Sequence, residues 1–257
     1  MHLPASRAIA SHLDFLPEAG STNTELVAKT TSGAAPWSVV ATTSQTAGRG
    51  RLGRSWVAPP GRTIAISVAL PLGGASLDRV GWVPLAAGLA MTRAVASLVP
   101  NHAVSLKWPN DVQVDGLKIS GLLAELVPAA SMIVMGAGLN LTMTTEELPT
   151  DTSTSLTLLG ASAEGIVDAA LAAYLRELFE VHTRLLDADF DADASGVRAE
   201  VIARCGTIGR DVRVELPGNQ ELLGVAEDID SLGRLLVRSG STVTTVAAGD
   251  ITHLRVR

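Results

Sequence analysis

The sequence predicts an α+β fold, with a mixed-sheet domain over residues 1–204 and a small β-barrel over residues 205–257. In the first part, candidate strands alternate with candidate helices, and apolar residues recur at helical spacing over about 163–187 and 194–204. In the second part, short alternating strands, such as residues 211–216, lie between closely spaced Gly, Asn and Ser turns. Strands of this length and spacing are typical of a small barrel.

The first long helix is predicted over residues 21–33. Thr22 and Glu25 have the spacing of a capping box, in which two side chains bond each other's backbone N–H groups. Gly33 comes where a left-handed residue commonly ends a helix. This segment therefore carries both a start signal and a stop signal.

The other elements of the first domain follow from length, composition and turn signals. We expect an Ala/Leu/Val-rich helix at about 78–99, and strands at 38–43, 63–70, 104–107, 112–114, 118–126 and 131–141. The turn between the strands at 112–114 and 118–126 is an Asp-Gly pair, which favours a tight hairpin.

Composition excludes several classes of protein. Hydrophobic residues make up 47 % of the 257 residues, which is enough for a sizeable core and argues against disorder. The net charge of −6 argues against a general nucleic-acid binder. Residues 1–15 lack the pattern of a signal peptide, and residues 126–145 read as a buried strand and loop, so no membrane association is expected. The single cysteine, Cys205, fits a reducing cytoplasm.

A local basic cluster stands out in this acidic chain. Residues 48–54, which we call the arginine loop, read GRGRLGR. They formally match G-x-G-x-x-G, but Pro59, Pro60 and Gly61 follow, and these forbid the helix that a dinucleotide fold needs. Three neighbouring arginines repel one another unless an anion joins them, so we favour an anion site over a solvated surface turn.

Two of the three lysines lie eleven positions apart. Lys107 opens the sequence KWPND, and Lys118 lies in a largely apolar strand, where a charge needs a partner that a bound anion would supply. A lysine is a compact charge that can bridge two anionic oxygens. In the turn, Asn110 could anchor a hydroxyl or phosphate, and Asp111 could accept a proton. The alternative is that both satisfy their own turn amides.

A glycine-rich strand end follows at residues 136–140, GAGLN. Gly136 and Gly138 remove side chains from a buried strand, which often marks close approach of a ligand. Asn140 carries a donor and an acceptor, so it could read the polar edge of a purine. The alternative is a β-bulge with a satisfied asparagine.

Together these segments resemble the biotin protein ligase family. The resemblance covers essentially the whole chain and rests on Ser21-Thr22-Asn23, Gln45, GRGRLGRSW (48–56), KWPND (107–111), GLKISGLLAE (116–125), GAGLN (136–140) and the C-terminal AGDITHLR. It implies a mixed-sheet catalytic domain like that of class II aminoacyl-tRNA synthetases, followed by an SH3-like domain.

The resemblance also implies an activity. Such enzymes use ATP and Mg²⁺ to convert biotin into biotinyl-5′-AMP, and then transfer biotin to a lysine of the biotin carboxyl carrier domain of an acyl-CoA or pyruvate carboxylase. Only twenty residues precede Ser21, too few for a DNA-binding module, so we expect the ligase-only type without DNA as a partner. A lipoate protein ligase, a DNA-binding biotin-sensing repressor and a noncatalytic SH3-like interaction protein are the alternatives.

The roles of individual residues are likewise what the resemblance implies. Lys118 would lie between the biotin carboxylate and the α-phosphate, Arg51 would help cover the adenylate, and Asp111 would orient or deprotonate the acceptor amine. The biotin site would comprise Ser21, Thr22, Asn23, Gln45, Gly48, Arg49, Gly50, Arg51, Lys118 and Gly121. The ATP site would comprise Arg49, Arg51, Arg54, Trp56, Lys107, Asn110, Lys118 and Asn140. The scattered histidines give no protein metal site.

Overall fold

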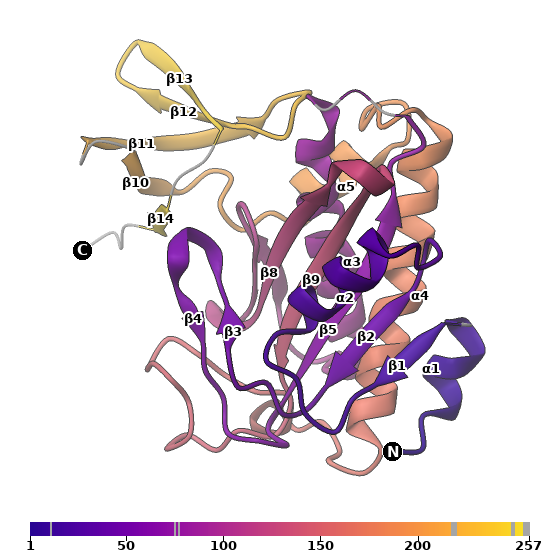
Figure 1. Ribbon diagram of the computed structural model, residues 1–257. Coiled ribbons are helices and arrows are strands. Elements are labelled where there is room, and N and C mark those ends of the chain that lie inside the picture. Colours follow the sequence, from indigo (N-terminus) through magenta and orange to yellow (C-terminus); the bar gives the residue numbers. More distant parts are fainter. Residues whose placement is uncertain (11, 75, 77, 217–219, 248–249, 254–257) are drawn as a thin grey trace.

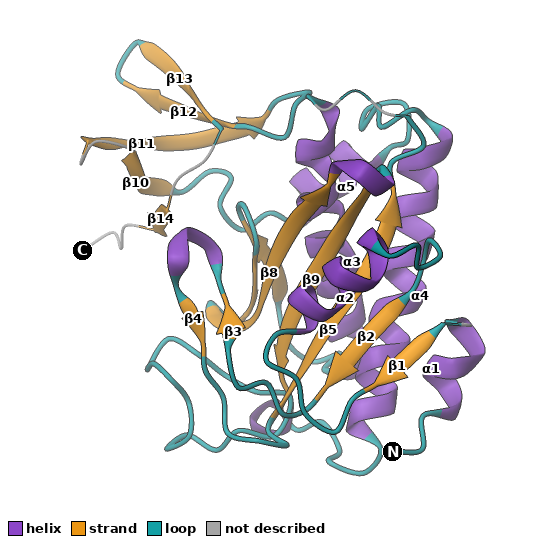
Figure 2. Ribbon diagram, in the orientation of Figure 1, coloured by secondary structure: helices purple, strands orange, loops and turns teal. Residues whose placement is uncertain are grey.

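The computed structural model describes residues 1–10, 12–74, 76, 78–216, 220–247 and 250–253 (Figure 1). A large sheet with helices on both faces forms the body of the molecule, and a second, smaller sheet lies beyond it near the C-terminus (Figure 2). A short hairpin, β3 (Gly48–Arg49) and β4 (Ser55–Trp56), stands beside the large sheet and carries the arginine loop.

The large sheet has seven strands in the order β1-β2-β5-β9-β8-β7-β6. Their bounds are β1 (Leu13–Phe15), β2 (Val39–Thr42), β5 (Thr63–Pro71), β6 (Val104–Lys107), β7 (Asp111–Val114), β8 (Leu117–Val127) and β9 (Met132–Asn140). β1 and β2 are parallel, whereas the other neighbours are antiparallel. This mixed sheet, together with the helices, confirms the predicted α+β class.

Helices cover the sheet unequally. α2 (Thr22–Thr31) contacts β2, β5, β8 and β9 on one face, whereas α3 (Trp82–Leu98) and α4 (Ile166–Asp187) pack together on the other (Figure 2). The shorter helices are α1 (Pro4–Ile9), α5 (Val197–Arg204), η1 (Arg51–Gly53), η2 (Arg79–Gly81), η3 (Pro128–Ala130) and η4 (Thr157–Leu159). Most of the core lies between the sheet and the α3–α4 pair.

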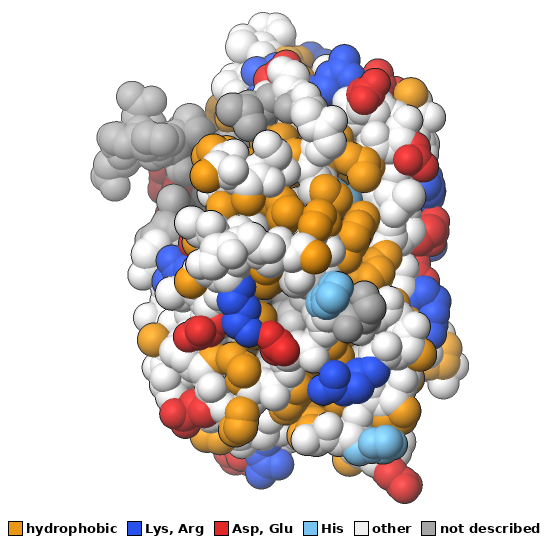
Figure 3. All heavy atoms as spheres, turned by 45° about the vertical axis from the view of Figure 1, so that its right-hand side comes forward, with side chains coloured by type: hydrophobic (Ala, Val, Ile, Leu, Met, Phe, Trp, Pro, Cys, Tyr) orange, Lys and Arg blue, Asp and Glu red, His pale blue; other side chains and the backbone are white. Residues whose placement is uncertain are grey.

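Among the described residues, one helical segment, Arg79–Leu98, has the length and composition of a membrane span. It is 67 % buried within the fold, and its α3 portion includes the fully buried Trp82. Its apolar character is therefore explained by its place in the core. On the face drawn in Figure 3, blue basic and red acidic side chains are interspersed, with orange hydrophobic side chains between them.

The start of α2 differs from the prediction. Ser21 is the N-cap, and its hydroxyl accepts a hydrogen bond from Thr24 N at 3.5 Å. Thr22 is the first helical residue, and its side chain turns to Gln45, so the predicted Thr22–Glu25 capping box is wrong. The stop signal is confirmed, because Gly33 follows the helix with φ of 94°.

The C-terminal sheet has five antiparallel strands in the order β13-β12-β11-β10-β14. Their bounds are β10 (Asp211–Leu216), β11 (Gln220–Ile229), β12 (Leu235–Ser239), β13 (Thr242–Val246) and β14 (Asp250–His253). α5 ends at Arg204, just before the division that we predict at residues 204–205 and that stays a prediction. Part of the AGDITHLR segment lies outside the described residues.

Two buried tryptophans join the two parts of the molecule. Trp82 Nε1 donates to Ser231 O at 2.8 Å, and Trp108 Nε1 donates to Gly233 O at 3.0 Å. The backbone N–H of Trp108 also donates to the Thr207 hydroxyl at 3.0 Å. The C-terminal part thus contacts the KWPND turn at Trp108, two residues before Asn110.

Candidate active site

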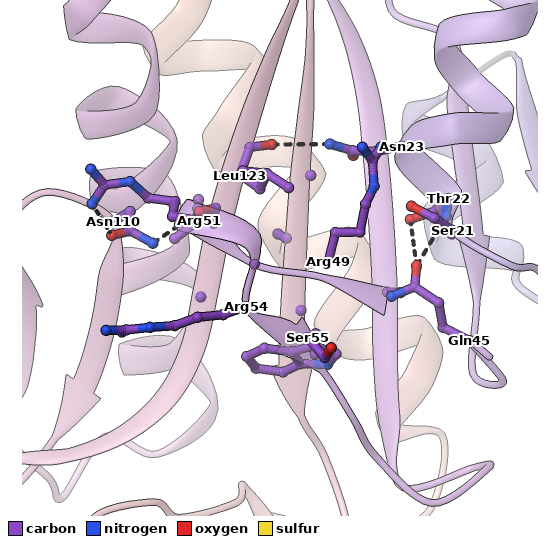
Figure 4. A pocket seen from close by; sticks show the side chains of 18 of the residues that line it. Ser21, Thr22, Asn23, Gln45, Arg49, Arg51, Arg54, Ser55, Asn110 and Leu123 are labelled. Atoms are coloured by element: carbon purple, nitrogen blue, oxygen red, sulfur yellow. Dashed lines mark hydrogen bonds between the residues drawn. The ribbon is translucent and has the colours of Figure 1, made fainter. Parts of the chain in front are cut away.

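A cavity of about 160 Å³ opens between the start of α2, the arginine loop, the KWPND turn and the strands β8 and β9 (Figure 4). It is lined by Ser21, Thr22, Asn23, Gln45, Arg49, Gly50, Arg51, Arg54, Ser55, Trp56, Ala65, Asn110, Asp111, Lys118, Gly121, Leu122, Leu123, Gly136, Ala137 and Gly138. Segments far apart in the sequence therefore meet here, and most of the predicted site residues are among them.

The lining is strongly basic for an acidic protein. Arg49, Arg51, Arg54 and Lys118 all face the cavity, with Asp111 as its one carboxylate. Positive charge concentrated in a recess attracts anions, and the low dielectric of the walls strengthens the attraction. The arrangement suits a ligand with several anionic oxygens.

Lys118 has an ionic partner within the protein. Its Nζ lies 2.7 Å from Asp111 Oδ1, and the two side chains are 36 % and 22 % exposed. The sequence analysis expected a bound anion as the partner of this charge. The structure shows that a side-chain carboxylate, Asp111, pairs with it. The Lys118 ammonium also lies 5.9 Å from the centre of the Trp56 ring.

A β-bulge turns Lys118 into the cavity. Val112 pairs with Ser120 and Gln113 pairs with Lys118, so Ile119 is an extra residue on β8. In a regular strand, residues 118 and 121 would point to opposite faces. Here a side-chain carbon added to Gly121 would lie 3.3 Å from Lys118 Nζ, which places both on the cavity face. The bulge therefore turns the Lys118 side chain to the same face of the sheet as Gly121.

The backbone of Lys118 is held by a further segment. Lys118 N donates to Thr152 O at 2.7 Å, and Thr154 N donates to Lys118 O at 2.8 Å. Asn140 supports that segment, because its Nδ2 donates to Thr154 O at 2.9 Å. The catalytic candidate is therefore held at both its backbone N–H and its backbone carbonyl.

The arginine loop is tied to the KWPND turn. Arg51 Nη1 donates to Asn110 Oδ1 at 3.0 Å, and Asn110 Nδ2 donates to Leu122 O at 3.0 Å (Figure 4). Leu122 N in turn donates to Asn110 O at 2.9 Å. Asn110 thus joins the loop to β8 and holds Arg51 over the cavity.

Three glycines form the floor of the cavity. Gly121 pairs with Gly138 across β8 and β9, and Gly136 lies two residues along β9. A side-chain carbon on Gly138 would lie 2.6 Å from the Trp56 ring, and one on Gly136 would overlap the Asn23 amide. The sequence predicts close approach to a ligand here, and the structure shows close approach of two side chains of the site.

Trp56 lies on this floor. Its indole Nε1 is buried and has no hydrogen-bond partner among the described residues. A buried donor of this kind is costly, and Nε1 lies close to Gly138, where an added side-chain carbon would be 3.0 Å away.

Three predicted site residues lie outside the cavity lining. Asn140 is buried behind Lys118, and Gly48 packs against the Gln45 amide and the Trp56 carbonyl. Lys107 lies on β6, where burial and then the charges of Lys107 and Arg210 lower the pKa of His253 to about 4. Their assignment to the ligand sites stays a prediction.

Two residues that the sequence analysis did not single out contact the polar end of the cavity from outside its lining. Ser67 is a fully buried hydroxyl on β5, 2.6 Å from Asn23 Oδ1. Glu125, on β8, accepts hydrogen bonds from Asn23 and Arg49. The available signal was a polar residue in an apolar buried strand, which needs a partner.

Among the described residues no group of three or more His, Cys, Asp or Glu side chains could hold a metal ion. Asp111 alone lines the cavity as a carboxylate, whereas Mg²⁺ prefers several oxygen ligands. A divalent ion that enters with nucleotide phosphates would therefore keep those phosphates and water as ligands.

Comparisons with known proteins point the same way. Residues 18–140 match the model of the Biotin/lipoate A/B protein ligase family, and residues 207–254 match that of the Biotin protein ligase C terminal domain. The chain is 43 % identical to a biotin–[acetyl-CoA-carboxylase] ligase of Mycobacterium tuberculosis over 95 % of this chain and 89 % of that protein. It is 27 % identical to the enzyme of the same name from Paracoccus denitrificans over 92 % and 98 %.

Solved structures show the same fold. The biotin protein ligase from Aquifex aeolicus, in complex with biotin and ATP, matches with a TM-score of 0.77 and 24 % identity over 95 % of this chain and 99 % of that one. The biotin protein ligase from Leishmania major, in complex with biotinyl-5-AMP, matches with a TM-score of 0.62.

Proposed function

Because this chain belongs to the Biotin/lipoate A/B protein ligase family, we propose that it is a biotin protein ligase that makes biotinyl-5′-AMP and then biotinylates a carrier-domain lysine. The first step joins biotin to ATP and releases pyrophosphate. The second transfers biotin to the carboxyl carrier domain of an acyl-CoA or pyruvate carboxylase and releases AMP. The observation that carries the proposal is the meeting of Lys118 and the arginine loop in one cavity.

Adenylate formation brings two anions together. The biotin carboxylate must attack the α-phosphate, and the mutual repulsion raises the barrier unless nearby positive charge cancels it. Lys118 and the loop arginines supply that charge from two sides of the cavity. They are fixed before the substrates arrive, by the ion pair to Asp111 and the hydrogen bond to Asn110. ATP would bring Mg²⁺ with it, which would neutralise the leaving pyrophosphate.

The other end of the cavity suits the uncharged ring of biotin. Ser21, Thr22 and Gln45 place hydroxyl and amide groups at the N-terminus of α2, where backbone N–H groups also lie. Leu123, Ala65 and Ala137 add apolar lining. A ligand with a ring that hydrogen-bonds at one end and a carboxylate at the other fits this division of the cavity.

The arginine loop would retain the intermediate. A mixed anhydride is hydrolysed in open water, so a loop that covers it protects it. Arg51 reaches over the cavity to Asn110 and joins the loop to the opposite wall. Acyl transfer then needs a neutral acceptor amine, for which Asp111 is the base within reach.

Incubating the protein with biotin, ATP and Mg²⁺ and measuring biotinyl-AMP by mass spectrometry tests the first step. A carboxyl carrier domain added afterwards should gain the mass of biotin on one lysine. Lipoate in place of biotin separates the two branches of the family, and formation of only the lipoyl adenylate would overturn the choice of substrate. A gel-shift experiment tests the expectation that DNA is not a partner.

The cytoplasm is the compartment that we propose. The single cysteine, Cys205, is buried, and burial raises the pKa of its thiol, so it is an unreactive packing residue that needs no oxidising environment. Immunodetection of the protein in fractionated cells would check this.

A further inference from the structure

A continuous chain of hydrogen bonds surrounds the polar end of the cavity. It joins six residues from four secondary-structure elements and one connecting loop, in the order Gln45, Thr22, Ser67, Asn23, Glu125 and Arg49. The chain starts at Gln45 and returns four residues further along, at Arg49 in the arginine loop. One network therefore connects the groups that line the cavity to the loop, and Figure 4 shows its first contact, between Gln45 and Thr22.

The directions of the bonds at Asn23 and Ser67 follow from two groups that can only accept, the Glu125 carboxylate and the Leu123 carbonyl. A carboxylate can only accept hydrogen bonds, and Glu125 Oε1 lies 2.7 Å from Asn23 Nδ2. The amide of Asn23 is thereby fixed with its oxygen toward Ser67, whose hydroxyl lies 2.6 Å away. Because the Asn23 oxygen can only accept, it takes the single proton of Ser67.

The orientation of the Gln45 amide is fixed at the start of α2. Thr22 N donates to Gln45 Oε1 at 3.0 Å, and the Thr22 hydroxyl lies 3.2 Å from the same oxygen. Ser67 has given its proton to Asn23, so at 2.9 Å the Thr22 hydroxyl must donate to Ser67, and the Thr22 backbone N–H alone donates to Gln45 Oε1. The Gln45 amide is held with its oxygen toward α2, which leaves its NH₂ group as the donor offered to the cavity.

Glu125 also anchors the arginine loop. Arg49 Nη2 lies 2.8 Å and 3.0 Å from the two Glu125 oxygens and 3.1 Å from the Thr24 hydroxyl. Arg49 and Glu125 are 47 % and 27 % exposed, so the pair stands at the edge of the cavity. Without the carboxylate, Arg49 would lose its ionic partner and keep only the Thr24 hydroxyl, and Asn23 Nδ2 would keep only the Leu123 carbonyl, at 3.2 Å.

We propose that Glu125 and Ser67 are positioning residues that hold the Asn23 amide from its two ends, and that Glu125 also tethers the arginine loop through Arg49. Neither needs to touch the substrate. The inference rests on the proposed function for the identity of the ligand, biotin, but the tethering of the loop is a property of the protein alone.

Three variants of the full chain test this. Glu125→Gln removes the charge that pairs with Arg49 and puts an NH₂ group in place of one acceptor oxygen, and Ser67→Ala removes the proton donor to Asn23. Glu147→Gln is the matched control, since Glu147 is equally exposed at 27 % and pairs with Arg62 at 3.0 Å outside the cavity lining. Isothermal titration with biotin gives affinity, and thermal unfolding shows whether each variant is folded.

For Glu125→Gln and Ser67→Ala we expect biotin to bind roughly tenfold more weakly, with KM for biotin raised and kcat for adenylate formation changed by less than about threefold. Glu147→Gln should match the wild type. Unchanged or tighter biotin binding in folded Glu125→Gln would overturn the inference, because a carboxylate that merely competes for Arg49 would give that result.

Limited trypsin digestion tests the tether without any ligand. Trypsin cleaves after arginine, so release of the loop in Glu125→Gln should speed cleavage after Arg49, Arg51 or Arg54 relative to wild type and Glu147→Gln. Equal cleavage rates would contradict the tether. If the wild type is cleaved more slowly than Glu125→Gln but binds no biotin, the tether stands and the proposed function fails. The failure of the inference and the failure of the proposed function are therefore distinguishable.

Discussion

Lys118 Nζ and Asp111 Oδ1 lie 2.7 Å apart across the neighbouring strands β8 and β7. The cation proposed for adenylate formation and the base proposed for acyl transfer are thus held together before substrates bind. The α-phosphate would draw Lys118 away from Asp111 during the first step. The carboxylate would then be available for the acceptor amine in the second step.

Lys118→Ala should reduce adenylate formation by about 10²–10³-fold, as expected for the loss of one preorganised charge in the transition state. The side chain is partly exposed, so the fold should persist. ATP–pyrophosphate exchange measures the step, and thermal unfolding checks the fold. Lys29→Ala is the matched control, because Lys29 pairs with Asp14 on the surface. Exchange at the wild-type rate in Lys118→Ala would contradict the assignment.

Asp111→Asn should affect the two steps differently. The amide cannot take a proton from the acceptor lysine, so transfer from preformed biotinyl-AMP should slow by about 10²-fold or more. Adenylate formation should be better preserved, since Lys118 remains. Single-turnover transfer to a carrier domain, compared with ATP–pyrophosphate exchange, separates the steps. An equal loss in both would show that Asp111 acts only by holding Lys118.

Arg51→Ala should weaken retention of the intermediate. The substitution removes the hydrogen bond that joins the arginine loop to Asn110, so the loop should cover the adenylate less completely. We expect biotinyl-AMP to appear faster in solution in the absence of acceptor, measured by mass spectrometry after rapid filtration. Arg62→Ala, which breaks a pair with Glu147 outside the cavity lining, serves as the control. The same release rate in both variants would contradict the role of Arg51.

Much of the site was predictable because its residues combine local sequence signals with an unusual charge pattern. The arginine loop and Lys118 stood out as cations in an acidic chain, and the structure places them in one cavity. The strands that carry them were predictable from apolar runs between turn signals. α1 and β1 were not, because six-residue and three-residue elements give too short a pattern to recognise.

What the sequence concealed depends on pairing between distant residues. The bulge at Ile119 arises from the register of β7 against β8, and an alternating pattern alone puts Lys118 on the wrong face. Likewise, Ser67 and Glu125 acquire their partners only when β5, β8 and the start of α2 come together. Thr22 was misread as a cap because its hydroxyl contacts Ser67 and Gln45 and not a backbone N–H of α2.

Gly138→Ala should disturb the cavity through Trp56. The added methyl would lie 2.6 Å from the Trp56 ring. The backbone of Gly138 is held in β9 between two neighbouring strands, so the indole must shift. We expect weaker binding of biotin and ATP and a changed tryptophan emission spectrum in a folded protein. Gly20→Ala is the control, because a side-chain carbon there meets no atom within 4 Å. Wild-type affinity in Gly138→Ala would show that Trp56 can shift without a change in the ligand site.

His182 should make stability depend on pH, although it is remote from the chemistry. Burial lowers its pKa from 6.5 to about 4, against the raising effect of its hydrogen bond to Pro71 O. Since that oxygen can only accept, the proton lies on Nε2, at 2.8 Å, and Nδ1 is buried without a partner among the described residues. The rings of Trp37 and Phe190 lie 5.4 Å away, so a second proton would leave a charge among aromatic groups.

Because the pKa is lower in the folded chain than in the unfolded one, the neutral ring contributes stability fully above pH 6.5, and this contribution falls away as the pH drops toward 4. The total is at most about 3 kcal/mol. Urea unfolding at pH 7, 6 and 5 should therefore show a steeper loss for wild type than for His182→Gln, which does not titrate. His12→Gln, at an exposed position, should keep the wild-type slope. Parallel curves for wild type and His182→Gln would mean that the buried ring takes up its proton without loss of packing.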